Sequence, residues 1–242
     1  MWRTWLRRWA LPPLIWYLIM KKQAWIIIAI VAVCCTVMGV VDAVIQPGYW
    51  VKSACKLVMF LILPAIFALC NKNVNIKDVF TPNKKGLKIA FSLCVPLYVL
   101  ILGAYMLLKD VFDFSAVTGA LTGNIGVNKN NFIFVAIYIS FVNSLLEEFF
   151  FRGFAFLTLK KYAGRKIAYI FSAFMFALYH IAMMTGWFSI WVFAIALLGL
   201  FAGGLIFNYL NEKSDNIYTS WFVHMFANFA INTIGFILFG II

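Results

Sequence analysis

Three ionisable side chains lie within six residues of one long apolar stretch of this 242-residue chain. They are Glu147, Glu148 and Arg152, and each ionisable group costs roughly 2.5–3.5 kcal/mol at the centre of a membrane helix. Glu148 and Arg152 are four residues apart, so on a helix they share one face and can form an ion pair. The spacing therefore predicts a paired charge inside a helix that is otherwise apolar.

Glu147 lies about 100° around the same helix from Glu148. Its own face carries three further polar residues and no cation: Ser140, Asn143 and Ser144. A carboxylate held in this way can act as a general base toward a water molecule. The alternative interpretation is a purely structural charge cluster that fixes how the helices pack.

Both histidines of the chain, His180 and His224, also fall in apolar stretches. His224, Asn228 and Asn232 are spaced four residues apart, so they line one helix face. At a rise of about 1.5 Å per residue, the glutamates and both histidines lie about 13–21 Å from flanks on the same side of the membrane. A lone buried histidine is ordinarily a hydrogen-bonded core residue, but these groups have depths that allow them to meet in one cavity.

The elements that position these residues are membrane helices. The chain is 65% hydrophobic and 12% charged, whereas a soluble domain is about 45–50% apolar and about 25% charged. This composition excludes a soluble globular domain and a disordered chain, and it predicts an all-α polytopic bundle of about seven transmembrane helices. The predicted spans are roughly 24–45, 54–70, 89–108, 132–158, 167–185, 188–209 and 217–241, and the segment 109–131 is predicted to be a loop.

The charges of the loops predict an orientation. The net charge is +12, which in a membrane protein indicates anionic lipids as partners rather than nucleic acid. With the N-terminus in the cytoplasm, fifteen Lys and Arg residues lie on the cytoplasmic side. Four lie on the other side, and Arg152 lies within a span. The four are Lys52, Lys56, Lys109 and Lys129.

The first residues form a separate unit. Trp2, Trp5 and Trp9 recur at helical spacing with three arginines between them, which is typical of an interfacial amphipathic helix. We therefore expect an interfacial basic and aromatic helix over residues 1–23 and a transmembrane domain over 24–242.

Two features are expected to serve packing only. Asp42 stands alone near the end of the first span, as an interfacial carboxylate or helix cap. Gly199, Gly203 and Gly204 in the sixth span allow a neighbouring helix to approach closely. The five cysteines follow no disulfide or metal spacing and are expected to be small buried hydrophobes.

Three motifs in order on three spans give the chain a family resemblance. They are Glu147-Glu148-x-x-x-Arg152, Phe176-x-x-x-His180 and His224-x-x-x-Asn228, within a core at about 130–235. This set resembles the CPBP family, which includes CAAX prenyl-protein endopeptidases and the bacteriocin-processing or immunity proteins also called Abi. The resemblance implies an intramembrane endopeptidase. It implies that Glu147 and His180 activate a water, that His224 and Asn228 stabilise the oxyanion, and that Glu148 and Arg152 support the site.

The same resemblance leaves a metal-dependent alternative. Members are often described as metalloproteases, and Glu147, His180 and His224 would then bind Zn²⁺. However, no His-Glu-x-x-His motif stands on one helix, and the amide of Asn228 suits an oxyanion better than zinc. The glutamate mechanism without a cofactor is therefore favoured.

Two other classes of function remain open. A proton-coupled transporter could use the same Glu and His residues, although no internal repeat of the kind found in transporters is visible. A non-catalytic scaffold or immunity protein could bind a partner through the same cavity. For the protease, the resemblance implies a membrane-associated peptide or protein substrate, prenylated or a leader peptide. The short chain favours a bacterial plasma membrane.

Overall fold

The computed structural model describes residues 13–111, 113–184 and 189–242, and within these ranges the chain is helical with no strand. Seven helices in this part are long and apolar enough to cross a membrane, which confirms the predicted all-α bundle. The spans are Lys21–Ile45, Tyr49–Cys70, Lys84–Leu108, Phe132–Ala163, Arg165–Met184, Ile190–Ser214 and Tyr218–Leu238. Trp2, Trp5 and Trp9 of the predicted interfacial helix lie outside the described residues.

The first three spans precede the charged motif. The first continues from a helix that begins at Pro13, so residues 13–23, expected to be interfacial, share one helix with this span. A proline suits this first position because the N–H that it lacks would have no partner inside the helix. The helical segments here are α2 (Pro13–Val40), η1 (Val41–Ile45), α3 (Tyr49–Leu57), η2 (Val58–Ile62), α4 (Leu63–Cys70), η3 (Lys77–Phe80) and α5 (Lys84–Leu108).

The fourth span is the least regular helix. Two wider, π-helical segments interrupt it on either side of Glu147, and such segments are frequent at functional sites. In the second of them, the Thr158 hydroxyl donates to the carbonyl of Gly153 five residues earlier, at 2.8 Å. The span consists of α7 (Phe132–Ile137), η4 (Tyr138–Asn143), α8 (Ser144–Glu147), η5 (Glu148–Thr158) and α9 (Leu159–Ala163).

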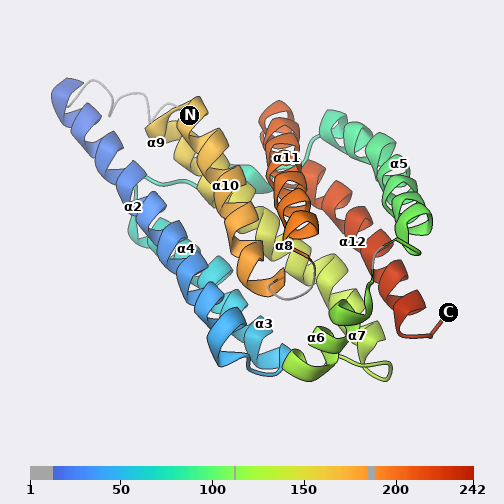
Figure 1. The fold of residues 1–242 in the computed structure, drawn as a ribbon. Helices are drawn as coiled ribbons and strands as arrows, with labels where there is room; N and C mark the ends of the chain where they lie inside the picture. Colours follow the sequence, from blue (N-terminus) through green and yellow to red (C-terminus); the bar gives the residue numbers. More distant parts are fainter. Residues whose placement is uncertain (1–12, 112, 185–188) are drawn as a thin grey trace.

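The last three spans are α10 (Arg165–Met184), α11 (Ile190–Ser214) and α12 (Tyr218–Leu238). The fourth span runs through the middle of the bundle (Figure 1), and its η5 segment contacts α2, η2, α10 and α11. Helix α12 packs along α5 on one side of it, and α10 packs along α11. Side chains of the central span can therefore meet side chains from most of the other helices.

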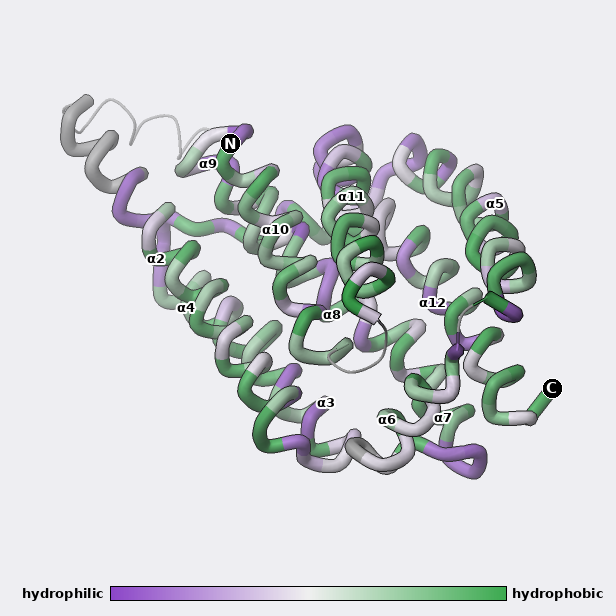
Figure 2. Tube along the Cα trace, viewed as in Figure 1, coloured by the Kyte–Doolittle hydropathy of each residue, from purple (hydrophilic) through white to green (hydrophobic). Residues whose placement is uncertain are grey.

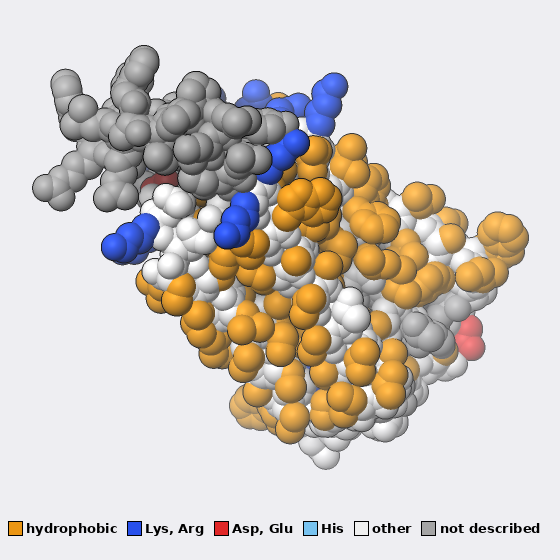
Figure 3. All heavy atoms as spheres, turned by 90° about the vertical axis from the view of Figure 1, so that its left-hand side faces the viewer, with side chains coloured by type: hydrophobic (Ala, Val, Ile, Leu, Met, Phe, Trp, Pro, Cys, Tyr) orange, Lys and Arg blue, Asp and Glu red, His pale blue; other side chains and the backbone are white. Residues whose placement is uncertain are grey.

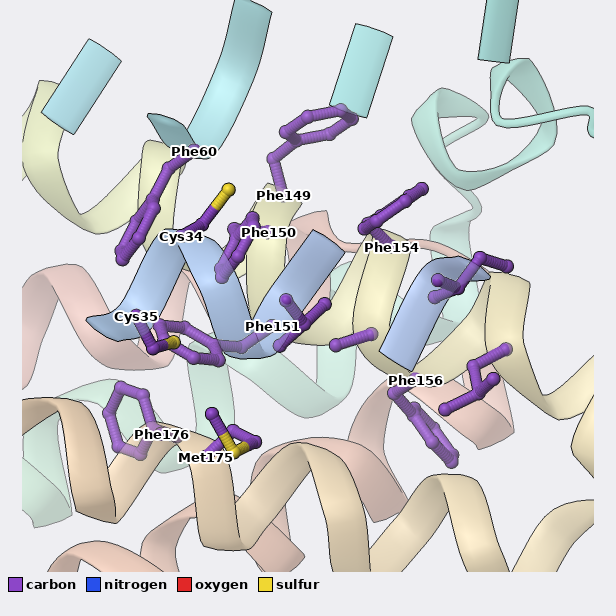
Figure 4. Close-up of a cluster of buried hydrophobic side chains, with 14 of the residues drawn as sticks. Cys34, Cys35, Phe60, Phe149, Phe150, Phe151, Phe154, Phe156, Met175 and Phe176 are labelled. Atoms are coloured by element: carbon purple, nitrogen blue, oxygen red, sulfur yellow. The ribbon is translucent and has the colours of Figure 1, made fainter. Parts of the chain in front are cut away.

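Aromatic packing fixes the central span against its neighbours. The η5 segment contributes Phe149, Phe150, Phe151, Phe154 and Phe156 to the main core, which Figure 4 shows with Cys34 and Cys35 of α2. The ring of Phe60 from η2 stacks on Phe150, with 4.1 Å between the ring centroids. Buried aromatic pairs of this kind contribute about 0.5–1.5 kcal/mol beyond their buried area.

The outer surface is apolar. Large side chains such as Leu107, Trp191 and Leu69 are more than three-quarters exposed, and Figure 3 shows one face that hydrophobic side chains cover, with Lys and Arg at one end. The tube in Figure 2 is hydrophobic along most of the helices and hydrophilic toward their ends. Such a surface is costly in water and suits lipid, so the chain is an integral membrane protein.

The segment 109–131 differs from the predicted loop, because it contains helix α6 (Ser115–Ile125). The carboxylate of Asp113 accepts a hydrogen bond from the Ser115 N–H at 2.8 Å, which gives an early N–H of the helix a partner. Hydrogen bonds from Ser115 lower the pKa of this carboxyl. The helix ends at Gly126, whose φ of 69° favours glycine.

Two charged residues have surroundings that differ from those predicted from the sequence. Asp42 does not stand alone, because Lys52 of α3 reaches its carboxylate at 2.7 Å. Lys56 is not on the membrane flank: it is only 4% exposed and lies within the second span. When Lys56 is left out of the count, three basic residues instead of four remain on the side of the membrane predicted to be opposite the cytoplasm.

The sixth span makes its close contact through only one of its three glycines. A Cβ at Gly204 would lie 3.0 Å from the Cα of Ala173 in α10, whereas nothing lies within 4 Å of a Cβ at Gly199 or Gly203. The prediction that small residues allow close helix packing therefore holds at Gly204.

This contact gives a test of the packing. We expect Gly204→Leu to lower the melting temperature of the purified protein, because overpacking a close contact costs about 1–3 kcal/mol. Gly203→Leu, on an open face of the same helix, should leave it nearly unchanged. Equal melting temperatures for the two variants would contradict the packing described here.

Candidate active site

Three spans bring the predicted site residues together. Glu147 and Glu148 lie where α8 passes into η5, His180 lies near the end of α10, and His224 and Asn228 lie on α12. All five residues are less than 10% exposed. The first and third motifs therefore meet in one buried polar cluster, and His180 lies next to it through Phe176, whose ring contacts His180, Arg152 and His224.

Glu148 is held on several sides. Arg152 pairs with it at 3.4 Å, which confirms the predicted pairing of these residues on one helix face. The Nδ1 atom of His224 lies 2.9 Å from Glu148 Oε1, and the hydroxyl of Ser220 donates to Oε2. That hydroxyl accepts in turn from the amide of Asn211 at 2.6 Å. Glu148 is fully buried, and these contacts leave it little freedom to turn.

Arg152 is neutralised by Glu148 and packed between aromatic rings. Its guanidinium carbon lies 4.0 Å from the ring centroid of Phe176 and 5.0 Å from that of Phe207. Within the part of the chain that the structure describes, its side-chain nitrogens have no hydrogen-bond partner of good geometry. The ring faces stabilise the buried cation instead.

Glu147 has a cation, contrary to the prediction from its own helix. The Nζ atom of Lys56 lies 2.5 Å from Oε1, and the amide of Asn143 donates to the same oxygen at 3.1 Å. The other oxygen, Oε2, lies 3.7 Å from Nε2 of His224. This separation exceeds a direct hydrogen bond, so both atoms remain able to bind a water molecule.

Each histidine is oriented by its Nδ1 atom. His180 Nδ1 lies 2.7 Å from the carbonyl oxygen of Phe176, and His224 Nδ1 lies beside the Glu148 carboxylate. Both partners accept, so Nδ1 carries hydrogen in each ring and the neutral ring has its lone pair on Nε2. His180 can therefore accept a proton through Nε2, and His224 can donate through Nε2 when that nitrogen also carries hydrogen.

The asparagines of α12 connect it to the fourth span. Asn228 donates to the carbonyl of Ile139 at 3.2 Å, and Asn232 donates to the hydroxyl of Ser140 at 2.9 Å. The predicted face of His224, Asn228 and Asn232 is therefore directed toward the fourth span. An amide nitrogen has two hydrogens, so Asn228 retains one for a further acceptor.

The donor set does not fit the metal-dependent alternative. Among the described residues, no group of three or more His, Cys, Asp or Glu side chains is arranged to hold a metal ion. Glu147, the carboxylate of the predicted set, is already paired with the ammonium of Lys56. This positive charge would repel a divalent cation at the same oxygen.

The sequence reasoning missed Lys56 and the hydroxyl of Ser220. A signal for Lys56 was present, because it falls inside the predicted span 54–70 and an ionisable residue within a span usually has a partner. Ser220 precedes His224 by one helical turn on α12. Its contact with Glu148 depends on how α12 packs against the fourth span, which no local spacing indicates.

Comparison with known proteins gives one family. Residues 129–230 match the model of the Rce1-like type II CAAX prenyl endopeptidases. The match covers the segment that carries all three motifs, and it confirms the resemblance to the CPBP intramembrane proteases. The search of curated proteins and the search of solved structures each found no match.

The buried ion pair of Arg152 leads to a stability test. We expect Arg152→Met to lower the melting temperature by about 10 °C, because removing one partner of a buried pair costs about 3–5 kcal/mol. Arg165→Met is the matched control, since Arg165 pairs with Glu212 on the exposed end of the bundle and such pairs contribute little. An equal effect of both substitutions would contradict the supporting role of Arg152.

Proposed function

We propose that this membrane protein, similar over residues 129–230 to CAAX prenyl endopeptidases, is an intramembrane endopeptidase that uses glutamate and histidine without a metal. The observation that carries the proposal is the position of His224 between the two glutamates. Its Nδ1 lies 2.9 Å from Glu148 and its Nε2 lies 3.7 Å from Glu147. One glutamate is thereby fixed as support, while the other presents an oxygen to the reacting groups.

Glu147 and His180 are the proposed bases for water. A water molecule at Glu147 Oε2 attacks the carbonyl carbon of the substrate peptide and gives one proton to Glu147 or to Nε2 of His180. When the carbon–nitrogen bond breaks, that proton passes to the leaving amine. A positioned general base contributes about 10²–10⁴-fold to a rate, and both groups are oriented for this task by their other contacts.

Asn228 and His224 are the proposed donors to the oxyanion. The negative charge that develops on the carbonyl oxygen accepts the second amide hydrogen of Asn228 and, when the His224 ring is protonated, the hydrogen on its Nε2. Their positions are supported by the bonds to Ile139 and Glu148. Fixed donors stabilise this charge strongly where water is excluded.

The proposed substrate is a membrane-associated peptide or protein, such as a prenylated chain or a leader peptide. A substrate held in the bilayer can reach a site buried among membrane helices. We place the basic end of the bundle in the cytoplasm of a bacterial plasma membrane, where Lys and Arg meet anionic lipids.

The first test compares new protein termini in membranes that carry wild type or Glu147→Ala at equal expression. New termini should appear with wild type and be lost in the variant, because water activation requires the Glu147 carboxylate. Glu212→Gln is the control, since Glu212 pairs with Arg165 away from the site. If Glu147→Ala gives the wild-type termini, catalysis through Glu147 is wrong, and a transporter or scaffold becomes the better interpretation.

The second test removes metals. Cleavage by the purified chain should persist after treatment with a chelator, because the residues of the site supply both the base and the oxyanion donors. Loss of cleavage that is restored by Zn²⁺ would instead support the metal-dependent alternative.

A further inference from the structure

We infer that Lys56 is the resident counter-ion of Glu147 and a positioning residue for this carboxylate. Lys56 comes from the second span, outside the matched segment 129–230. The ion pair itself follows from the contacts of the two side chains. Its consequence for turnover rests on the proposed function.

The contacts of Glu147 are divided between its two oxygens. Lys56 and Asn143 both bind Oε1, at 2.5 and 3.1 Å. Lys56 also binds the side-chain oxygen of Asn143 at 2.5 Å, so the three groups form a closed arrangement. With Oε1 held in this way, the carboxylate cannot rotate freely, and Oε2 is directed to the side where His224 lies.

The surroundings of Lys56 suit a permanent cation rather than a side chain that reaches the membrane surface. Its ammonium lies 4.8 Å from the ring centroid of Tyr179 and 5.5 Å from that of Phe60. Phe60 is fully buried in the main core, and Tyr179 is nearly so. Ring faces stabilise a desolvated ammonium, so α10 and η2 both contribute to holding this charge beside Glu147.

The balance of charge within the buried cluster also supports Lys56 as the counter-ion of Glu147. The buried cluster contains two carboxylates, Glu147 and Glu148, and Arg152 balances only one of them. With Lys56 included and both histidines neutral, the two negative and two positive charges of the cluster sum to zero. Without Lys56 the cluster would keep one uncompensated negative charge inside the bundle, which is strongly destabilising.

Lys52 offers a matched control for Lys56. It lies one turn earlier on α3, carries the same charge, and pairs with Asp42 at 2.7 Å instead of Glu147. Loss of Lys52 therefore removes a lysine from the same helix and leaves the contacts of Glu147 in place.

The first part of the test needs no substrate. The melting temperatures of wild type, Lys56→Met, Glu147→Gln and the double variant are measured for the full chain in detergent. Each single substitution leaves one buried charge unpaired and should lower the melting temperature by about 10 °C. The double variant should lie closer to wild type than either single variant. Additive losses would overturn the inference.

The second part measures turnover with a fluorogenic peptide that ends in a farnesylated cysteine and three further residues. We expect Lys56→Met to lower kcat about 100-fold or more, because the base loses its orientation, while KM changes little. Lys56→Arg, which keeps the charge, should recover part of kcat, and Lys52→Met should resemble wild type. Equal kcat in Lys56→Met and wild type would overturn the positioning role.

The two parts separate failure of the inference from failure of the proposed function. If the wild-type chain cleaves neither this peptide nor any membrane protein, the proposed function is wrong. The melting temperatures then still decide whether Lys56 is the counter-ion of Glu147. If wild type cleaves and the losses of melting temperature in the two single variants add up in the double variant, the proposed protease function is supported and the inference about Lys56 is wrong.

Discussion

The need to balance charge inside an apolar bundle governs the arrangement of this protein. Two adjacent glutamates lie in the middle of the bundle, and each would be costly there without a cation. Arg152 supplies one cation from the same helix and Lys56 supplies the other from the second span. The ammonium of Lys56 must reach Glu147 and must also stay out of the lipid. The fourth span therefore has to lie against α3 and η2. The aromatic core around Phe60 and Phe150 holds these segments in contact.

The two glutamates differ in freedom although they are neighbours in sequence. Glu148 uses both oxygens, toward His224 and Arg152 through one and Ser220 through the other. Glu147 has one oxygen engaged and one directed to the site. This difference follows from the helices that each residue faces, and it separates a supporting carboxylate from a reactive one. The same logic applies to the histidines, since each has Nδ1 bound and Nε2 left for chemistry.

Features that depend on local spacing could be predicted from the sequence, and features that depend on packing could not. Hydropathy locates all seven spans, and the four-residue spacing predicts the pair of Glu148 and Arg152. The pair of Lys56 and Glu147 joins residues 91 positions apart, so nothing on the helix of Glu147 indicates it. Helix α6 was missed because the glycines and asparagines of this segment suggested a loop. The carboxylate of Asp113 accepts a hydrogen bond from the N–H of Ser115, the first residue of the helix, and the composition of the segment does not indicate this contact. The roles of Glu147, His180, His224 and Asn228 remain predictions from the motifs.

The full burial of the η5 segment separates Glu148 and Arg152 from the bilayer. All eleven residues from Glu148 to Thr158 are buried around the whole circumference of the helix. Membranes differ in thickness, and spans that touch lipid adapt to them by tilting. Here the outer helices meet the acyl chains, while the segment that carries Glu148 and Arg152 touches only protein. The geometry of this supporting pair is therefore insulated from changes in lipid composition, to which the outer helices adapt.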